Sequence, residues 1–405
     1  MMSLKRMIYL GLAFSVFVLI ETRCVTGDAA APASDPRGKM YAGAASCRSC
    51  HQAICDSFAR TAHHAATAPG SDKTVLGNFE NGKNDFVFDA SVSVRMEKRD
   101  SGLYQVLYVH GAEKMARRFD IAFGKSKGQT CLYWQGDHVY QLPISYYTSV
   151  QNWGTSPGFS IMFPPDFSRM IGRNCFECHS SYIKNAEASV DEQGRMDEAA
   201  NEAMIPATLV YGIDCERCHG PAARHVEFQT ANPAGRQAKF ITSFASLNNQ
   251  QKLDACSVCH AGNDDEKIRP RFLFKPGDDL GDYFREGSGG GEMDVHGNQH
   301  GLLVQSKCFT QGRGLNCLTC HGAHTDAANS KAVYSQKCMG CHSEAGKNFC
   351  TAKSPDHETM KANCIDCHMP QQPSSLIYFQ LSGDPKRNAY DYTNHLIGIY
   401  ADKKK

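Results

Sequence analysis

The clearest alternation of hydrophobic and polar residues lies between positions 86 and 96. Six apolar side chains occupy every second position there, namely Phe86, Phe88, Ala90, Val92, Val94 and Met96. A period of two is typical of a β-strand with one buried face. We expect a turn over 98–102 and a partner strand over 103–109. Further strands are expected over 117–123, 130–134 and 139–144, which together predict a small antiparallel sheet.

After residue 163 this regular alternation fades. Short helical stretches, such as 196–203, are separated by loops rich in Gly, Pro and Asn. The chain is therefore predicted to be α+β, with an antiparallel β domain inserted between two parts that contain only short helices and loops.

The N-terminus has the pattern of an export signal. Lys5 and Arg6 precede an apolar run of 14 residues over 7–20, which is too short to cross a bilayer comfortably. We expect residues 1–27 to form a signal peptide that is cleaved before Asp28.

Cys24 offers an alternative, a lipid anchor, although Arg23 is a poor residue before a lipidated cysteine. No other apolar run approaches the roughly 18 residues of a membrane-spanning helix. The mature chain is thus expected to be exported to the periplasm, cell envelope or extracellular surface, without a transmembrane span.

The overall charge excludes one class of partner. Lys and Arg number 43 against 42 Asp and Glu, a net charge of +1, so the chain is not expected to bind nucleic acid through bulk positive charge. The unusual feature is the content of 19 cysteines and 17 histidines.

Fourteen cysteines form seven Cys-x-x-Cys pairs, and a histidine directly follows every pair. The paired cysteines are Cys47 and Cys50, Cys175 and Cys178, Cys215 and Cys218, Cys256 and Cys259, Cys317 and Cys320, Cys338 and Cys341, and Cys364 and Cys367. The histidines that follow them are His51, His179, His219, His260, His321, His342 and His368.

Cys-x-x-Cys-His is the attachment signature of c-type haem. The two thiols bond the porphyrin covalently, and the histidine binds the iron as its proximal ligand. Zinc would require the pairs to combine two by two, and seven is odd; it also gives no reason for the histidines. A thioredoxin-like redox motif would occur once. The sequence therefore predicts seven covalently bound haem c groups.

The remaining ten histidines bear on the function, because a haem with two axial histidines is closed and one with a single histidine has an open site. His110 ends an expected strand and His138 follows a turn, so both are expected to be solvated or hydrogen-bonded. The other eight are candidates for distal ligands: His63, His64, His225, His296, His300, His324, His357 and His395. Of the adjacent His63 and His64 at most one is expected to bind iron, which leaves seven candidates for seven haems.

Two spacings predict ligation between neighbouring motifs. His324 lies three residues beyond His321, a span of at most about 10 Å, too short to reach the opposite face of the same haem. His63 lies 12 residues beyond His51, about 18 Å along a helix. Both are expected to serve another haem.

The spacing of the motifs predicts the domains. The first two motifs start 128 residues apart, so we expect a haem 1 segment over 28–73, a haem-free β domain over 74–165 and haems 2 to 7 over 166–405. Four cysteines outside the motifs, Cys55, Cys131, Cys308 and Cys350, suggest two disulfides in an exported protein. Cys308–Cys350 and Cys55–Cys131 are the pairings that we expect, although four cysteines allow three connectivities.

Three segments resemble the cytochrome c-552/c-554-like family of multihaem c-type cytochromes. They are Cys317-Leu-Thr-Cys-His-Gly-Ala-His324, the stretch from Cys215 to His225, and the stretch from Cys364 to Pro370 that ends Cys-His-Met-Pro. The resemblance covers about 40–70 and 166–400, and it implies short helices and loops wrapped around closely stacked haems, with His225 and His324 as distal ligands. The inserted sheet has no counterpart in the small members of that family.

The leading functional hypothesis is electron transfer through closed bis-histidine haems in an anaerobic or envelope respiratory chain. Redox proteins or membrane quinol oxidase and reductase complexes are the expected partners. The alternative is an oxidoreductase of a nitrogen or sulfur compound with one open haem. The nitrite reductases of the resembled group carry a Lys in place of one motif histidine, and all seven motifs here have His. A third hypothesis is a subunit of a filament or complex.

Overall fold

The fold was analysed in a computed structural model, which describes residues 34–186, 202–262, 265–285, 293–294, 296–312, 314–325, 330–343, 349–350 and 357–400, without the side chains of 357 and 359. The expected signal peptide over 1–27, the alternative lipid anchor at Cys24 and most of the expected helix over 196–203 lie outside these residues. In the described part of the chain, no helix is long and apolar enough to cross a membrane.

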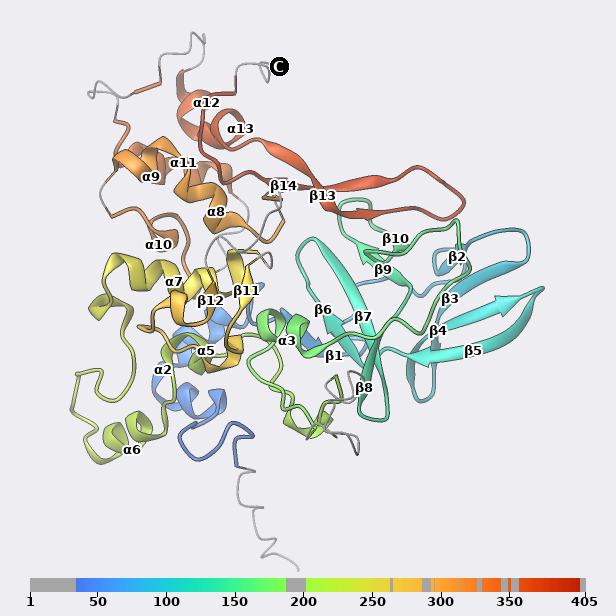
Figure 1. Ribbon diagram of the computed structural model, residues 1–405, viewed down its shortest axis with the longest axis horizontal. Coiled ribbons are helices and arrows are strands. Elements are labelled where there is room, and N and C mark those ends of the chain that lie inside the picture. The colour runs from blue at the N-terminus through green and yellow to red at the C-terminus, as the bar shows by residue number, and fades with distance from the viewer. Residues whose placement is uncertain are drawn as a thin grey trace, which may run out of the picture.

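Short helices and β-sheets occupy opposite sides of the molecule (Figure 1). The α-helices are α2 (Ala44–Phe58), α3 (Arg173–His179), α5 (Cys215–His219), α6 (Ala223–Ala231), α7 (Asn249–His260), α8 (Gln299–Val304), α9 (Lys307–Gln311), α10 (Cys317–Cys320), α11 (Lys331–Met339), α12 (His357–Ala362) and α13 (Cys364–His368). Short 3₁₀ turns span Pro206–Thr208, Phe244–Ser246, Arg271–Leu273 and Leu280–Asp282.

The β part consists of two antiparallel sheets. One has the order β1-β6-β7-β9-β10, with β8 also paired to β7, and is built from β1 (Thr67–Pro69), β6 (Ile121–Phe123), β7 (Gly128–Gln135), β8 (His138–Gln141), β9 (Ile144–Tyr147) and β10 (Asn152–Thr155). The other has the order β2-β3-β4-β5, from β2 (Asp85–Val87), β3 (Val92–Arg99), β4 (Gly102–Val109) and β5 (Ala112–Arg118). A two-stranded ribbon joins β11 (Glu266–Lys267) to β12 (Phe284–Arg285) in the helical part.

Three expected strands are interrupted where local chemistry favours a turn. The strand expected over 86–96 is β2 and β3, because the Asp89 carboxylate accepts hydrogen bonds from the backbone N–H groups of Ser91 and Val92 and closes a turn. The segment 117–123 divides between β5 and β6, which belong to different sheets. The segment 139–144 breaks between β8 and β9 at Pro143, which has no N–H to donate.

The alternation nevertheless identifies the buried face. Phe86, Val94 and Met96 are fully buried in a core between the two sheets. At its centre Trp153 contacts the rings of Phe79 and Phe119, and its indole N–H donates to the Asn78 carbonyl at 2.9 Å.

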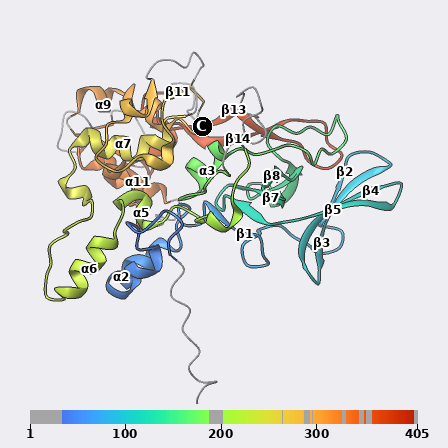
Figure 2. The same ribbon diagram turned by 60° about the horizontal axis from the view of Figure 1, so that its bottom comes forward.

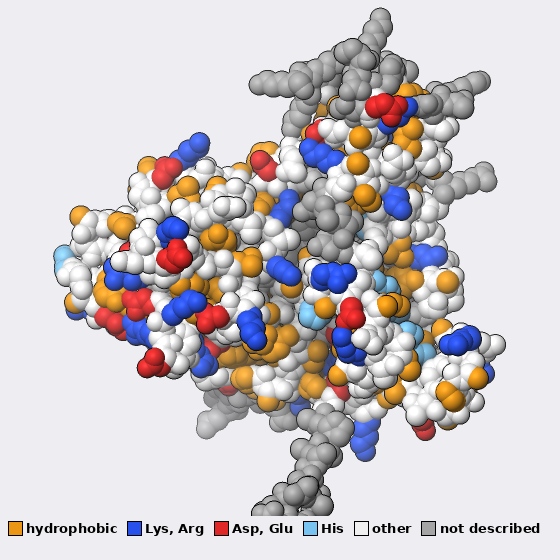
Figure 3. Space-filling model, turned by 180° about the vertical axis from the view of Figure 1, so that it is seen from behind, with side chains coloured by type: hydrophobic (Ala, Val, Ile, Leu, Met, Phe, Trp, Pro, Cys, Tyr) orange, Lys and Arg blue, Asp and Glu red, His pale blue; other side chains and the backbone are white. Residues whose placement is uncertain are grey.

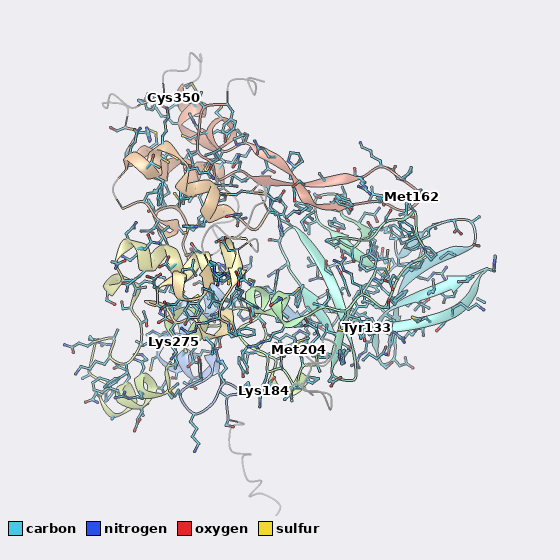
Figure 4. The ribbon with its side chains drawn as sticks, viewed as in Figure 1. Tyr133, Met162, Lys184, Met204, Lys275 and Cys350 are labelled. Atoms are coloured by element: carbon cyan, nitrogen blue, oxygen red, sulfur yellow. The ribbon has the colours of Figure 1, made fainter. Side chains whose placement is uncertain are left out.

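The opposite face of the first sheet packs against the helical part. Ile121, Leu132 and Val139 form a second core with Phe176 of α3 and with Met204, which is labelled in Figure 4. Alternate residues of β6 and β7 thus face the two cores, as the pleat requires.

A C-terminal hairpin that the sequence pattern did not indicate ties the two parts together. Its strands are β13 (Gln371–Phe379) and β14 (Asn388–Thr393), and it extends from α13 across to the sheets (Figure 1). Phe379 stacks on Tyr147 of β9 with ring centroids 3.9 Å apart, and the Tyr390 hydroxyl donates to the Lys127 carbonyl at 2.7 Å. The sheet part therefore takes strand β1 from before residue 74 and is covered by a hairpin from after residue 370.

Replacement of Gly77 by alanine is expected to destabilise the sheet part. A Cβ atom at this position would lie 1.8 Å from Cζ2 of the buried Trp153, so the core has to shift, at a cost of roughly 1–3 kcal/mol in the free energy of unfolding. Chemical unfolding of the haem-loaded protein measures this loss. In Gly77→Ala/Trp153→Leu the two losses should be less than additive; equal stability of Gly77→Ala and the parent protein would contradict the packing.

Candidate haem-binding sites

The seven motifs lie within or at the ends of short helices. Residues three apart lie on the same face of a helix, so the helical geometry presents both thiols of a motif on one side. Polar caps start several of these helices: the side chains of Asp214, Asn248, Asn316 and Asn363 accept backbone N–H groups at the starts of α5, α7, α10 and α13. Below, sites 1 to 7 denote the motifs in chain order.

Four motif histidines face a distal candidate from elsewhere in the chain. His51 and His225 have ring centroids 6.5 Å apart, His219 and His324 5.8 Å, His321 and His395 6.2 Å, and His63 and His260 6.0 Å. Metal–nitrogen bonds are about 2 Å long, so two imidazoles on opposite sides of one metal ion have centroids about 6 Å apart. The separations therefore fit axial ligation of an iron between each pair.

The angle between the ring planes separates three of these pairs from the fourth. The ring planes differ by 15° for His51 and His225, 15° for His219 and His324, and 25° for His321 and His395. The planes of His63 and His260 differ by 78°. Site 4 is thus the one of the four with nearly perpendicular rings.

Hydrogen bonds hold the second ring nitrogen of most of these histidines. The Nδ1 atoms of His219, His225, His368 and His395 lie 2.7–3.1 Å from backbone carbonyl oxygens of Thr242, Lys239, Gly398 and Thr393. The His179 ring also bonds to the backbone of Ala66. Nδ1 of His260 and of His321 meets a side chain, Gln299 at 3.3 Å and Tyr334 at 3.4 Å. An Nδ1–H that donates to oxygen leaves Nε2 as the free lone pair for a metal.

Desolvation by neighbouring protein atoms favours the neutral form of several of these imidazoles, although His63 and His179 are exposed residues. Desolvation lowers the pKa of His63, His179 and His395 to about 4, with a smaller contribution from neighbouring histidines. A metal ion binds the neutral imidazole ring. At neutral pH these histidines can therefore bind a metal ion without first losing a proton.

Of the adjacent histidines, His63 meets a motif histidine, and His64 instead contacts the edge of Phe58 at 5.9 Å. His296 lies close enough to His179 to lower its pKa, and its ring contacts Tyr392 at 5.1 Å. His300 lies on α8, His342 follows α11, and His368 ends α13, where its Nδ1 bonds to the Gly398 carbonyl. His357 begins α12, and its side chain lies outside the described residues.

The two expected disulfides are absent, and both pairings were wrong. The structure has free thiols at Cys55, Cys131, Cys308 and Cys350. Cys131 is buried on β7 in the core between the sheets, whereas Cys55 lies on α2 in the helical part. Cys350 lies at the end of the helical part farthest from α2 (Figure 4).

The sequence patterns also did not indicate a buried ion-pair network between sites 1 and 3. Arg37 contacts Asp214 at 2.7 Å, Asp35 at 2.9 Å and Glu216 at 3.0 Å, and its side chain is 4% exposed. Glu216, between the two cysteines of motif 3, also accepts the backbone N–H groups at 42 and 43. The segment before motif 1 is thereby fastened to motif 3.

Comparisons with known proteins bear on the class of protein and on the fold. No protein-family model matches the chain. A curated relative, the multiheme cytochrome MtrA of Shewanella baltica (strain OS185), is 21% identical over 200 residues, which are 49% of this chain and 45% of the relative. The chain thus spans about half the length of that relative.

The crystal structure of the outer cell wall cytochrome OcwA is similar with a TM-score of 0.52 and 16% identity, and the match covers 89% of this chain and 80% of that chain. A likeness at this identity concerns the fold, a mixture of helices and antiparallel sheet. Neither comparison identifies the narrower c-552/c-554-like family. The motifs, the MtrA relative and the OcwA fold together support a multihaem c-type cytochrome.

Loss of Arg37 is expected to weaken the junction between sites 1 and 3. Arg37→Ala leaves the carboxylates of Asp35, Asp214 and Glu216 without their cation, which typically costs about 3–5 kcal/mol for a buried pair. The matched variant Arg37→Lys keeps the charge but cannot form the same fork of bonds, so its loss should be smaller. Thermal unfolding of haem-loaded protein tests this order, and an Arg37→Ala protein as stable as the parent would contradict it.

Proposed function

We propose that the chain is an exported cytochrome of the periplasm or cell envelope with seven covalent haem c groups, and that it transfers electrons through closed bis-histidine sites. The observation that carries this proposal is the placement of four motif histidines opposite four distal candidates, with centroids 5.8–6.5 Å apart. A structural zinc site gives no reason for facing rings at this spacing.

The assigned ligands are His51 and His225 at site 1, His219 and His324 at site 3, His260 and His63 at site 4, and His321 and His395 at site 5. His179 is the proximal ligand at site 2, with His296 as its distal candidate. The paired cysteines of each motif would form the thioethers. When bound, the haem iron supplies one-electron chemistry between its ferric and ferrous states.

The protein residues would restrict the haem iron to electron transfer. With haem bound, two histidines at each iron would leave no coordination site for a substrate. Hydrogen bonds from Nδ1 to carbonyl oxygens fix the rings of His219, His225 and His395 and would make these ligands more basic, which favours the ferric state and low potentials. The relatives' printed names, a multiheme cytochrome and an outer cell wall cytochrome, support an envelope role.

The surface bears on the choice of partner. On the face seen in Figure 3, Lys and Arg side chains are interspersed with Asp and Glu, and histidines appear mainly over the helix-rich half. With a net charge of +1, long-range electrostatic steering is weak. We therefore propose redox protein partners, or membrane quinol oxidase and reductase complexes, that dock through local contacts.

The test of the function is a haem count with low-temperature EPR on the same oxidised sample. We expect seven haems per chain, all low-spin. Nearly parallel axial rings give rhombic low-spin spectra, and nearly perpendicular rings give a highly anisotropic signal with a large gmax; site 4 should therefore contribute a large-gmax signal. A stoichiometric high-spin signal would instead favour the alternative, an oxidoreductase with one open haem.

The adjacent histidines supply a matched pair of variants. His63→Ala removes the proposed distal ligand of site 4, so we expect one haem to become high-spin and the large-gmax signal to disappear. His64→Ala removes a ring that contacts Phe58 and should leave the EPR spectrum unaltered. Equal spectra for the two variants would overturn the assignment of His63.

A further inference from the structure

The motif helices do not contact one another in chain order. α2 packs against α5, α7 packs against both α3 and α10, α10 packs against α11, and α11 packs against α13. In Figure 1, α2, α5, α7, α10, α11 and α13 follow one another along the helical side of the molecule, and α3 stands beside this row, next to the sheet. Figure 2 shows α3 in the same place between the helices and the strands.

The side chains of α7 contact two neighbouring motifs directly. Sγ of Cys259 lies 3.9 Å from the carbonyl oxygen of Glu177 in motif 2, and the side chain of Cys178 lies beside it. At the other motif, Cys256 lies beside Cys317. An amide bond of 2.8 Å between Asn316 and Asn249 joins the starts of α10 and α7.

Motif 3 provides a third neighbour. Arg217 in this motif donates to the Phe274 carbonyl at 3.5 Å, and Phe274 packs against Val258 and Cys259 of motif 4. Arg217 also donates to the Glu177 carbonyl of motif 2 at 3.3 Å, so motif 3 contacts motif 2 as well. Motif 4 is thus surrounded by motifs 2, 3 and 5, whereas motif 7 contacts motif 6 through α11 and α13.

We propose that site 4 is an electron junction, at which a side branch to site 2 leaves a through-route that runs from site 1 by way of sites 3, 4, 5 and 6 to site 7. This inference rests on the proposed electron-transfer function. Each step oxidises one ferrous site by one electron and reduces its ferric neighbour by one, and an external one-electron donor supplies the electrons.

The end of the branch lies against the sheet. The imidazole of His179 stacks on Phe123 of β6, with centroids 5.0 Å apart and planes 13° apart, and Phe176 beside it is fully buried. Cys50 of motif 1 and Cys367 of motif 7, at the two ends of the through-route, are exposed, and so are Cys175 of motif 2 and Cys341 of motif 6. Exchange with protein partners is therefore assigned to the ends of the through-route and to the end of the branch.

The first test locates the seven irons in the haem-loaded protein by anomalous X-ray diffraction. The expected result is that the iron of site 2 has the iron of site 4 as its nearest neighbour, and that site 4 is the iron with three close neighbours. An iron at site 2 that lies nearer to site 1, 3 or 5 than to site 4 would overturn the junction. Failure of the proposed function has a different signature, because it would appear as missing haems or high-spin iron.

The second test uses the large-gmax signal of site 4 as a reporter in EPR redox titrations. Adjacent haems influence each other's potential by charge, and this influence falls with distance. Removal of haem 2 by Cys175→Ala/Cys178→Ala should shift the midpoint of the site 4 signal, and removal of haem 7 by Cys364→Ala/Cys367→Ala should shift it much less. Equal shifts, or no shift on removal of haem 2, would contradict the proposal. If either variant fails to fold, the iron positions in the unaltered protein still decide it.

Discussion

The structure depends on one constraint, the approach of two imidazole rings from distant parts of the chain to about 6 Å. His51 meets a ring 174 positions away at His225, and His321 meets one at His395. Such a spacing accommodates one metal ion between the two rings. Loops without regular structure have to be held in place to bring the two rings to this separation. The backbone carbonyl groups that accept a hydrogen bond from Nδ1 contribute to this positioning.

The remaining positioning comes from polar contacts outside the motifs and from the sheet part. Arg37 and its three carboxylates hold the segment of site 1 against motif 3. The first sheet supports site 2 with the face opposite its own core, through Ile121 and Phe176. The C-terminal hairpin then links the end of the last motif back to β9 through Phe379 and Tyr147. The inserted sheet is therefore part of the support of the helical region.

The sequence allows the chemistry to be predicted more completely than the fold. The motif predicts the proximal histidines, because a fixed local signature carries that information. Elimination of His110 and His138 leaves eight candidates, and five of them, His63, His225, His296, His324 and His395, lie near motif histidines in the structure. Which histidine meets which motif could not be predicted, since the pairing depends on how loops cross in space.

The errors have equally specific causes. The alternation of apolar and polar residues predicts which face is buried but does not reveal a short turn within the segment. The segment 86–96 was therefore predicted as one strand and not as two. The β13 segment contains Pro373 and a register shift between Pro373 and Tyr378, which disrupts the period of two on which strand prediction depends. The disulfide pairing assumed that cysteines outside the motifs were near one another, and Cys131 is instead a buried core residue.

His63, the proposed distal ligand of site 4, connects these levels of structure. The backbone N–H of Ile213 donates to the His63 carbonyl at 2.9 Å, so the segment entering motif 3 positions a proposed ligand of motif 4. Gly212 permits this approach: its φ of +63° suits glycine, and a Cβ there would lie 2.1 Å from the His64 carbonyl oxygen. His63 itself follows the helix of motif 1. The contact between Ile213 and His63 thus couples the geometry of sites 1, 3 and 4. A shift of this contact would change the position of the His63 ring opposite His260.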